Sequence, residues 1–459
     1  MKTIETEVVV VGAGLAGLTA ARDLTASGHD TVVLEAQDRV GGRTLAVSAG
    51  SDVTVDLGGC WFSERKKHII ALADELRIGG YPTYDHGKQV LELDGRVQSF
   101  RAGIPILSPL TLLDIGKARL SLNMMCGQVP EHAPWLAARA TEWDNATLDD
   151  WMRNNMGNAK ARTLLASLAR SIWGAEPAEV NLLQALAYMR TVGSVEALTA
   201  ASGGLLSDLF VDGAHQISTL LADSLGDRVL LSQPVRALIQ SADQVEVRSA
   251  EVTVRARRAV VAIPPALLGD IAFDPVLSAD RLRIVRGLPM GRMAKVALVY
   301  PEPFWRAAGL SGQAGSDRPP VAATFDVSPC DGAVGILVGF VPGDWATQFS
   351  AMSESDRRAG VVDAFVRLFG PRAADYEHYL EKDWTADPWV RGCYFGLAER
   401  GLVTGPLRHV DAADGLVHWA GAETIWESFG SMDGAVASGR RAARQIAAAL
   451  RGDEEPALA

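Results

Sequence analysis

The sequence predicts a mixed α/β fold (α+β mixed), in which a discontinuous Rossmann-like domain holds an inserted second domain of sheet plus helices. A βαβ pattern occupies the N-terminus, strand patterns return near residue 209 after a helical stretch, and a strand and a long helix close the chain. The 459 residues exceed what one hydrophobic core usually supports. We expect residues 1–80, 209–284 and 388–459 to form the Rossmann-like domain. Residues 81–208 and 285–387 would form the inserted domain.

The N-terminal segment combines a buried strand, a glycine turn and a helix. Residues 7–11 are short, continuous and β-branched, and the stretch "GAGLAGLTAARDLTASG" follows with Gly12, Gly14 and Gly17 in GxGxxG spacing. A second strand, "DTVVLEA", ends on Glu35. In such a unit the first glycine permits the turn, the second lets the backbone approach a pyrophosphate, and the third allows close packing. The acid can accept hydrogen bonds from a ribose hydroxyl, so the unit predicts dinucleotide binding.

The middle of the chain changes character. Residues from about 105 to 205 are largely helical, with Trp135, Trp143, Trp151 and Trp173 interspersed, and core packing is the expected role of these rings. Strands follow in "DRVLLSQPV", "QVEVRS", "VRARRAVVAIPPALL" and "MAKVALVYPEPFW". The strand "GLVHWAGAE" then leads into a helix that opens near Asp433.

Composition excludes several classes of protein. The net charge is −11 and the longest basic run is Arg65-Lys66-Lys67, which argues against nucleic acid and anionic membranes as partners. The first apolar run is broken by glycines and no run approaches the length of a membrane span, so we expect neither a signal sequence nor a transmembrane segment. The four cysteines show no CxxC spacing and the histidines no metal pattern, so we expect no disulfide framework, no metal and a cytoplasmic location.

Four segments carry a resemblance to a known family. The turn "AQDRVGGRTLAV", the element "VDLGGCWF", the stretch "AIPPALL" and the closing "WAGAETIWESFGSMDGAVASG" resemble the flavin amine oxidases, with spacing closest to the monoamine oxidases. The resemblance covers nearly the whole chain and implies FAD as cofactor. The implied cofactor-binding residues are Gly12, Gly14, Gly17, Glu35, Ala36, Gly42, Arg43, Gly58, Val235, Trp384, Cys393, Gly421, Glu423 and Met432.

The resemblance also implies catalytic positions. Lys295 matches the lysine that holds a water against the flavin, and Trp384 matches a tryptophan beside the flavin ring. Cys393 and Tyr394 match a pair in which the cysteine carries the flavin covalently and the tyrosine forms one wall of an aromatic cage. A strand-end charge is the alternative for Lys295, core packing is the alternative for Trp384, and a small buried side chain is the alternative for Cys393.

One position departs from the family pattern. Ser431 stands where the second aromatic of the cage is expected, and Phe429 or Trp426 could supply a ring instead. A cage with one wall would be wider and more polar on that side, which affects the substrate more than the reaction. The substrate pocket implied by the resemblance consists of Tyr394, Ser431, Phe429, Ile172 and Leu198.

The resemblance implies oxidation of a C–N bond in a small-molecule amine. The product would be an imine that hydrolyses to an aldehyde or ketone, while O2 is reduced to H2O2. One alternative is an L-amino-acid oxidase, which would need a pocket arginine such as Arg190 or Arg306. Others are an FAD-dependent desaturase or dehydrogenase on an isoprenoid or porphyrinogen, and a flavin-binding protein without catalysis. A homodimer is a reasonable expectation for the family.

Overall fold

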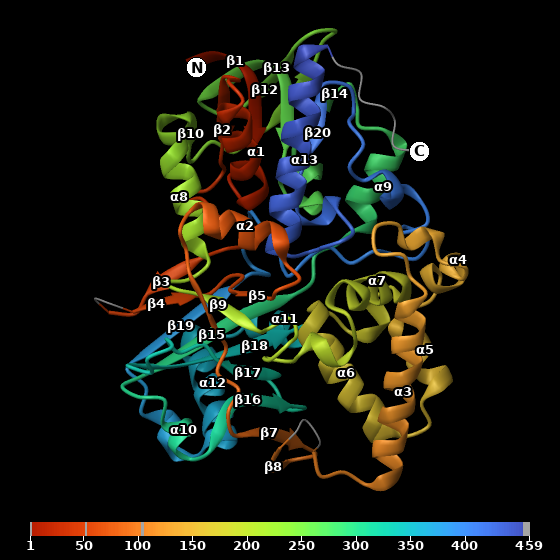
Figure 1. Ribbon diagram of the computed structural model, residues 1–459, viewed down its shortest axis with the longest axis vertical. Helices are drawn as coiled ribbons and strands as arrows, with labels where there is room; N and C mark the ends of the chain where they lie inside the picture. The colour runs from red at the N-terminus through yellow and green to blue at the C-terminus, as the bar shows by residue number, and fades with distance from the viewer. Residues whose placement is uncertain (1, 51–52, 102–104, 453–459) are drawn as a thin grey trace.

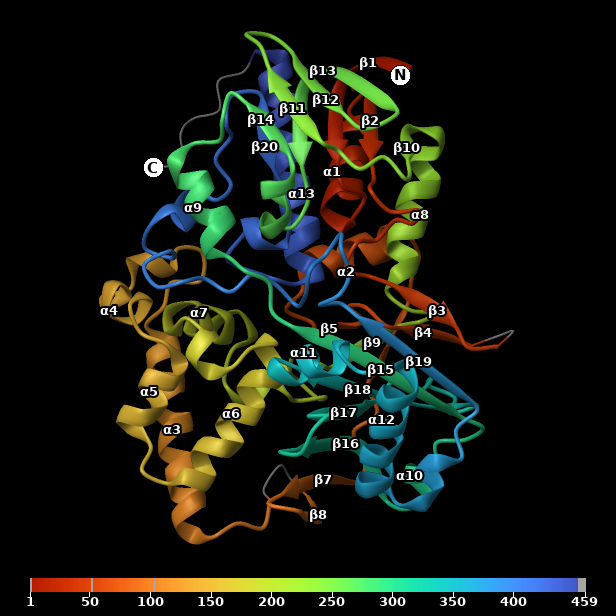
Figure 2. The same cartoon turned by 180° about the vertical axis from the view of Figure 1, so that it is seen from behind.

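The computed structural model describes residues 2–50, 53–101 and 105–452. Two large sheets lie one above the other along the long axis of the molecule, and a group of helices stands beside the lower sheet (Figure 1). The view from behind shows that the N-terminal strand, the green strands near residue 250 and the blue C-terminal helix share the upper region (Figure 2). Segments far apart in sequence therefore build one half of the molecule, and the mixed α/β class is confirmed.

The upper sheet has eight strands in the order β10-β2-β1-β13-β12-β11-β14, with β20 also pairing with β13. β1 runs parallel to both β2 and β13, as a βαβ unit requires. Helices α1, α2, α8 and α13 contribute to the apolar core beside this sheet. The strands are β1 (Lys2–Val11), β2 (Thr31–Leu34), β10 (Val229–Leu230), β11 (Ala237–Gln240), β12 (Val245–Arg248), β13 (Val252–Val261), β14 (Ala272–Asp274) and β20 (Val417–Trp419). The helices are α1 (Leu15–Ala26), α2 (Lys67–Glu75), α8 (His215–Leu225) and α13 (Met432–Arg451).

The lower sheet has seven strands in the order β19-β15-β18-β17-β16-β7-β8. Helix α12 packs its apolar side against one face, where Phe365 joins Val296 and Leu298 in a dry core. The strands are β7 (Lys88–Leu93), β8 (Arg96–Phe100), β15 (Met293–Tyr300), β16 (Leu310–Ser316), β17 (Ala323–Asp326), β18 (Gly335–Pro342) and β19 (His378–Asp383). The helices around this sheet are α10 (Phe304–Ala307), α11 (Asp344–Ser350) and α12 (Glu354–Phe369).

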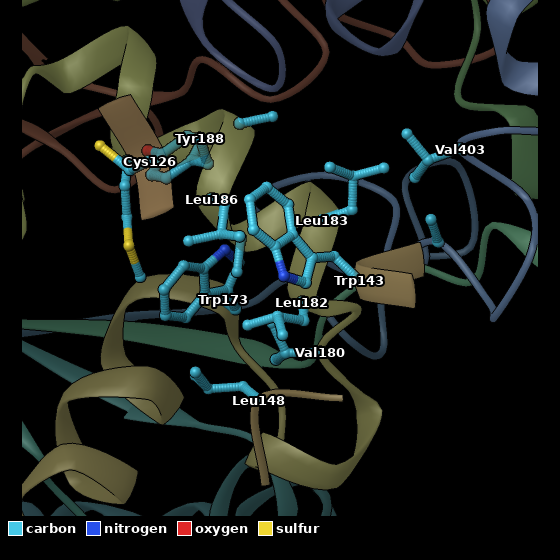
Figure 3. Close-up of a cluster of buried hydrophobic side chains, with 14 of the residues drawn as sticks. Cys126, Trp143, Leu148, Trp173, Val180, Leu182, Leu183, Leu186, Tyr188 and Val403 are labelled. Carbon is cyan, nitrogen blue, oxygen red and sulfur yellow. The ribbon is translucent and has the colours of Figure 1, made fainter. Parts of the chain in front are cut away.

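The middle of the chain is helical, as the sequence predicts, and it packs beside the lower sheet (Figure 1). Figure 3 shows Trp143 and Trp173 among leucines of this core, and both rings are buried. Trp151 is buried as well and Trp135 packs partly buried on the same core, so the core role predicted for the four rings is confirmed. The helices are α3 (Pro109–Gly127), α4 (Ala140–Asp144), α5 (Leu148–Asn155), α6 (Ala159–Trp173) and α7 (Leu182–Val192), with a short 3-10 turn at Glu196–Leu198.

Two small sheets and a helix complete the connections between the halves. β5 (Trp61–Phe62) and β6 (Gly80–Pro82) both pair with β9 (Asp208–Phe210), and β3 (Ala46–Ser48) pairs with β4 (Thr54–Asp56). Helix α9 (Ala279–Gly287) precedes β15. Every strand of the upper sheet lies within 1–80, 209–284 or 388–459, and every strand of the lower sheet within 81–208 or 285–387. Knowing which strands belong to which sheet does not show at which residue one domain ends and the next begins, so the domain limits stay a prediction.

Among the described residues, no helix is both long and apolar enough to cross a lipid bilayer.

Candidate active site

A cavity of about 610 Å³ lies between the two sheets and extends toward α3 and β7. Its size is typical of a site for a cofactor or a small molecule. We call the part lined by the β1–α1 turn and the Gly41–Arg43 turn the cofactor end, and the part lined by the lower sheet and α6 the substrate end. Of the residues predicted from sequence, the cavity is lined by Gly12, Gly14, Glu35, Ala36, Gly42, Arg43, Gly58, Ile172, Leu198, Val235, Lys295, Trp384, Cys393, Tyr394, Gly421, Ser431 and Met432.

Each of the three glycines at the β1–α1 turn is required for a different structural reason. Gly12 has φ +100, and an added Cβ would lie 2.9 Å from the Ala262 carbonyl oxygen. At Gly17 a Cβ would lie 2.0 Å from the Gly12 oxygen, so this glycine is required by packing and does not line the cavity. At Gly14, however, a Cβ would meet nothing within 4 Å in the described chain, although this residue faces the cavity. The glycine at 14 therefore leaves room for something other than protein.

The start of α1 offers hydrogen-bond donors to that room. Gly14 is the N-cap residue of α1, and no described side chain caps this end of the helix. The first N–H groups of a helix have no partner within it, and with the helix dipole they favour an anion. The open space at Gly14 and these donors fit the pyrophosphate of a dinucleotide.

Glu35 lies just past β2 and is buried, at 6% exposure. One carboxylate oxygen accepts a hydrogen bond from the Ala13 N–H at 2.6 Å, and the other accepts from the Gln37 N–H at 2.9 Å. Burial raises the pKa of this carboxyl, while the two backbone donors act in the opposite direction. Glu35 therefore stabilises the glycine turn through its hydrogen bond with Ala13, and it lines the cavity where a ribose is expected.

Arg43 links the cofactor end to two segments near the C-terminus. Its guanidinium donates to both carboxylate oxygens of Glu423, one of them at 2.8 Å, and also to the Tyr394 carbonyl oxygen at 2.8 Å. Glu423 is 1% exposed and does not itself line the cavity. The ion pair compensates two buried charges and ties the turn after β2 to the segment that carries Tyr394. Glu423 thus supports the cofactor end through Arg43.

Lys295 lies in the middle of β15 and is 3% exposed, which contradicts the alternative of a strand-end charge. Its ammonium donates to the Gly58 carbonyl oxygen at 3.0 Å and to the Cys60 sulfur at 3.2 Å. The same nitrogen lies 5.1 Å from the centroid of Trp61 and 5.6 Å from that of Phe340. Two hydrogen bonds and two aromatic faces compensate this buried cation, and the side chain is held at the cavity wall.

Trp384, Cys393 and Tyr394 meet at the same wall. The Trp384 ring is 2% exposed and its N–H donates to the Leu57 carbonyl oxygen at 2.9 Å. Burial raises the pKa of the Cys393 thiol to about 12, although Arg43 and Lys295 act to lower it. Burial also raises the pKa of Tyr394, whose ring lies 6.2 Å from that of Phe340. The wall is therefore aromatic and uncharged at neutral pH, apart from the lysine and arginine.

Phe429 is a correction to the predicted pocket. It is 2% exposed, does not line the cavity, and stacks on Trp426 with ring centroids 5.0 Å apart. Both rings belong to the core of the helical region, so neither replaces the missing cage aromatic. Ser431 does line the cavity, but its hydroxyl is occupied because it accepts from the Gly434 N–H and donates to the Ser428 carbonyl oxygen. Ser431 is the N-cap of α13.

The floor of the substrate end is a row of residues across the lower sheet. Strand register places Phe340 opposite Lys295, Ala323 opposite Phe340, Gly315 opposite Ala323 and Leu91 opposite Gly315. All five line the cavity. Strands lie about 4.8 Å apart, so the row extends about 19 Å from Lys295 to Leu91. A second row on the same face brings Phe325, Gln313 and Gln89 into the lining.

Sequence reasoning identified Lys295 but not the other four residues of the row, nor Cys60. The alternation of "MAKVALVY" indicates that Lys295 shares a face with Ala297, but the pairing of β15 with distant strands is not encoded locally. The cysteine next to Lys295 could have been suspected only from its place in "GGCW" beside the cofactor turn. Among the described residues, no group of three or more His, Cys, Asp or Glu side chains is arranged to hold a metal ion.

The two arginines considered for a substrate carboxylate lie elsewhere. Arg190 is exposed, and Arg306 pairs with the buried Asp326 carboxylate at 2.8 Å. Neither lines the cavity, whose arginines among the described residues are Arg43 and Arg236. Arg43 is engaged by Glu423, and Arg236 lies over the ring of Trp389. The substrate end thus presents apolar and aromatic side chains without a guanidinium.

Comparisons with known proteins agree with this geometry. Residues 15–447 match the family model described as flavin containing amine oxidoreductase. The chain is 39% identical over 444 residues to a Mycobacterium tuberculosis protein named as the flavin-containing monoamine oxidase AofH, covering 97% of each. It superimposes on cyclohexylamine oxidase from Brevibacterium oxydans IH-35A with a TM-score of 0.92, at 28% identity and covering 97% of this chain and 99% of the other. For wild-type putrescine oxidase bound to putrescine the TM-score is 0.90, at 28% identity, covering 97% and 100%.

Proposed function

Because the chain belongs to the family of flavin-containing amine oxidoreductases and is an FAD-dependent amine oxidase, we propose that it oxidises amines that lack a carboxylate, with O2 as electron acceptor and H2O2 as product. The observation that carries the proposal is the position of Lys295. This buried cation lies in the wall of an apolar cavity, next to the residues that fit FAD. A binding protein without catalysis would have no use for a desolvated lysine at that point.

The proposed FAD site is supported by the open space at Gly14, the free donors of α1 and the two buried acids Glu35 and Glu423. The chemistry that FAD supplies is acceptance of a hydride equivalent from the carbon next to the amine nitrogen. Gly42, Arg43, Gly58, Val235, Gly421 and Met432 line the same end. The protein contributes position and electrostatics, and water hydrolyses the imine product to an aldehyde or ketone.

The substrate end favours the neutral form of the amine. An alkylamine has a pKa near that of lysine, so neutralising it at pH 7 costs about 4 kcal/mol in water. Burial against Ile172, Leu198, Phe340 and Tyr394 disfavours the ammonium and reduces this cost. A neutral nitrogen has the lone pair that stabilises the positive charge developing at the neighbouring carbon. We assign Tyr394 and Trp384 to orientation of the amine and exclusion of water.

Lys295 is assigned to the proton and oxygen chemistry beside the cofactor. Its ammonium is fixed by Gly58 and Cys60, so it can hold a water at a defined place without reorganisation. The amino-acid oxidase alternative is less well supported, because the substrate end lacks an arginine among its described lining residues. A desaturase acting on a non-amine substrate would not need a cavity that neutralises a cation.

Cys393 is our candidate for covalent attachment of the flavin. It lines the cavity and lies close enough to Arg43 and Lys295 for both to favour the thiolate. The raised pKa of its thiol means that the resting group is protonated, so attachment would require FAD already held in place. The four cysteines of the chain are all free thiols, which supports the proposal of a reducing, cytoplasmic location. The homodimer stays a prediction.

The test is a panel of amines and amino acids incubated with the purified protein while H2O2 is measured. We expect peroxide from arylalkylamines and alkylamines, accompanied by bleaching of the flavin when oxygen is excluded. Peroxide from L-amino acids alone would support the amino-acid oxidase alternative instead. No flavin reduction by any amine would refute the proposed function.

A further inference from the structure

A pair of glutamine side chains lies at the end of the substrate cavity far from Lys295. Gln89 lies on β7 and Gln313 on β16, and both line the cavity on the same face as Leu91 and Gly315. The alternate residues Val90 and Ala314 point into the dry core under α12. The pair is therefore a polar group set in a largely apolar wall, and nothing in the proposed oxidation uses it.

The hydrogen bonds of the pair fix its orientation. The Gln89 side-chain N–H donates to the Gln313 side-chain oxygen at 2.7 Å, and the Gln313 N–H donates to the Thr199 carbonyl oxygen at 3.1 Å. A carbonyl can only accept, so Thr199 determines which way Gln313 points, and Gln313 in turn determines Gln89. The Gln89 side-chain oxygen accepts no hydrogen bond within the described chain. The side-chain oxygen of Gln89, at the end of this series of hydrogen bonds, is thus a free acceptor at the cavity wall.

The charged side chains that line this end of the cavity are acidic. Asp317 follows β16 and lines the cavity, and one of its oxygens accepts from the Asp94 N–H at 3.0 Å. Glu92 is neutralised by Arg367 at 2.9 Å and accepts from the Ser316 hydroxyl. The basic residues among the described lining are Lys295, Arg43 and Arg236, and none of the three lies on β16 or β7. The distal end therefore offers acceptors and a carboxylate, without a lining cation.

The distance to this acceptor is set by the sheet. β16 and β7 lie three and four strands from β15, which is about 14 to 19 Å at 4.8 Å per strand. An extended chain spans about 1.2 Å per bond, so roughly 12 to 16 bonds connect the two ends, because the side chains at both ends stand perpendicular to the sheet. The two smallest side chains of the floor, Ala323 and Gly315, lie between. A Cβ at Gly315 would meet only Leu91, at 3.6 Å, so the gap above it is not filled by protein.

We infer that Gln89, oriented by Gln313, is a specificity residue that accepts a hydrogen bond from a second donor on an elongated amine substrate. The donor is an ammonium or a hydroxyl group placed roughly 12 to 16 bonds from the oxidised carbon. Asp317 adds a preference for the ammonium. This inference rests on the proposed function, because it assigns the far end of the same substrate.

The experiment compares three substrates of equal length: an unbranched primary monoamine, the corresponding ω-amino alcohol and the α,ω-diamine. The series runs from about six to sixteen carbons, chosen from the bond count above. Wild type is expected to prefer the two substrates with a second donor over the monoamine by about fivefold in kcat/KM at the long end of the series. Gln89→Leu should abolish this preference, because kcat/KM for the amino alcohol and the diamine should fall to that for the monoamine measured with the same variant. Gln128→Leu, at the exposed end of α3, is the control and should change neither.

Asp317→Asn separates the two donors. This variant should reduce the preference for the diamine over the monoamine and leave the preference for the amino alcohol unchanged. Only the second ammonium of the diamine is attracted by the carboxylate charge of Asp317. Equal ratios in wild type and Gln89→Leu, with normal melting of the variant, would overturn the inference while the proposed function stands. If wild type oxidised none of the three substrates or the amine panel, the proposed function itself would fail.

Discussion

At the cofactor end of the cavity the glycine turn and its acid lie close together in sequence, whereas the floor of the substrate end is built from strands that are far apart. Gly12, Gly14 and Glu35 all lie within one βαβ unit, and their roles follow from local backbone geometry. The row from Lys295 to Leu91 joins five strands, and its most widely separated residues, Leu91 and Phe340, are about 250 positions apart in sequence. The first end is therefore rigidly specified, while the second can change residue by residue without altering the fold.

Gly14→Val should have the largest effect, because it fills the space intended for the pyrophosphate. A Cβ at residue 14 meets nothing in the described chain, so the variant should fold but purify without flavin colour or activity. Gly116→Val in α3, where a Cβ also has open space, is the matched control and should remain yellow. A fully yellow Gly14→Val protein would show that the cofactor end is misplaced.

Cys393→Ala tests whether the cofactor is linked to the cavity wall. Wild-type protein precipitated with acid should keep its yellow colour in the pellet, and the intact mass should exceed that of the chain by the mass of FAD. The variant should release the flavin into the supernatant, and Cys126→Ala, a buried core cysteine, should behave as wild type. Complete release from wild type would make Cys393 a packing residue.

Lys295→Met tests the residue at which the two ends meet. Removing a preorganised donor beside the reacting atoms should slow one half-reaction about a hundredfold, with the flavin retained. Anaerobic reduction and reoxidation by O2, followed separately by stopped flow, would identify which one. Lys88→Met at the exposed start of β7 is the control. Unchanged rates in both half-reactions would make Lys295 structural.

The buried carboxyl of Asp56, whose pKa is influenced by Lys295, should make the stability of the protein depend on pH. Burial raises the pKa of its carboxyl from 3.8 to about 6, although Lys295 and the Ala214 N–H act to lower it. The native state then binds the proton more tightly than the unfolded chain, so stability should fall as pH rises through this window. We expect the free energy of unfolding to fall by about 2 kcal/mol across this window. The shift in pKa alone would give about 3 kcal/mol, and partial exposure of the residue to solvent reduces it. Urea unfolding of Asp56→Asn should show a flatter pH dependence, and an unchanged slope would contradict the assignment.

Ser431→Tyr should have the smallest effect, confined to the substrate end. It places a ring opposite Tyr394 and should shift preference toward small arylalkylamines several-fold in kcat/KM. It also removes the N-cap of α13, at a cost of about 1 kcal/mol, so melting should occur at a lower temperature. Ser431→Thr keeps the cap and should change neither property. An unshifted preference would mean that residue 431 does not contact substrate.

The difference between the two ends also explains what the sequence could predict. Gly12, Gly17 and Glu35 were identifiable because the constraints on them are local: a positive φ, a 2.0 Å approach and an acid at the end of a strand. Phe429 was placed in the pocket incorrectly, because proximity in sequence to Ser431 does not determine which way a ring points. Its stacking on Trp426 depends on a core formed by distant helices.

The same reasoning applies to the residues that sequence reasoning missed. Phe340, Gly315 and Gln89 are unremarkable in sequence, and only the register of β18, β16 and β7 brings them to one surface. Cys60 became significant only when folding placed its sulfur 3.2 Å from the Lys295 nitrogen. Register depends on pairing across the whole sheet, which a single sequence does not display.

The register of the cavity floor has a consequence for how this enzyme can diversify. Strand residues alternate between faces, so a single-residue insertion inside β17 would exchange Ala323 with the core-facing Thr324. Insertions and deletions within these strands should therefore be selected against, whereas point substitutions at positions 340, 323, 315 and 91 keep the register and should be tolerated. Neighbouring row residues lie directly opposite one another on adjacent strands, so substitutions at them should combine non-additively. Related enzymes that share this sheet should thus differ in substrate range by substitutions at alternate positions, with strand lengths held constant.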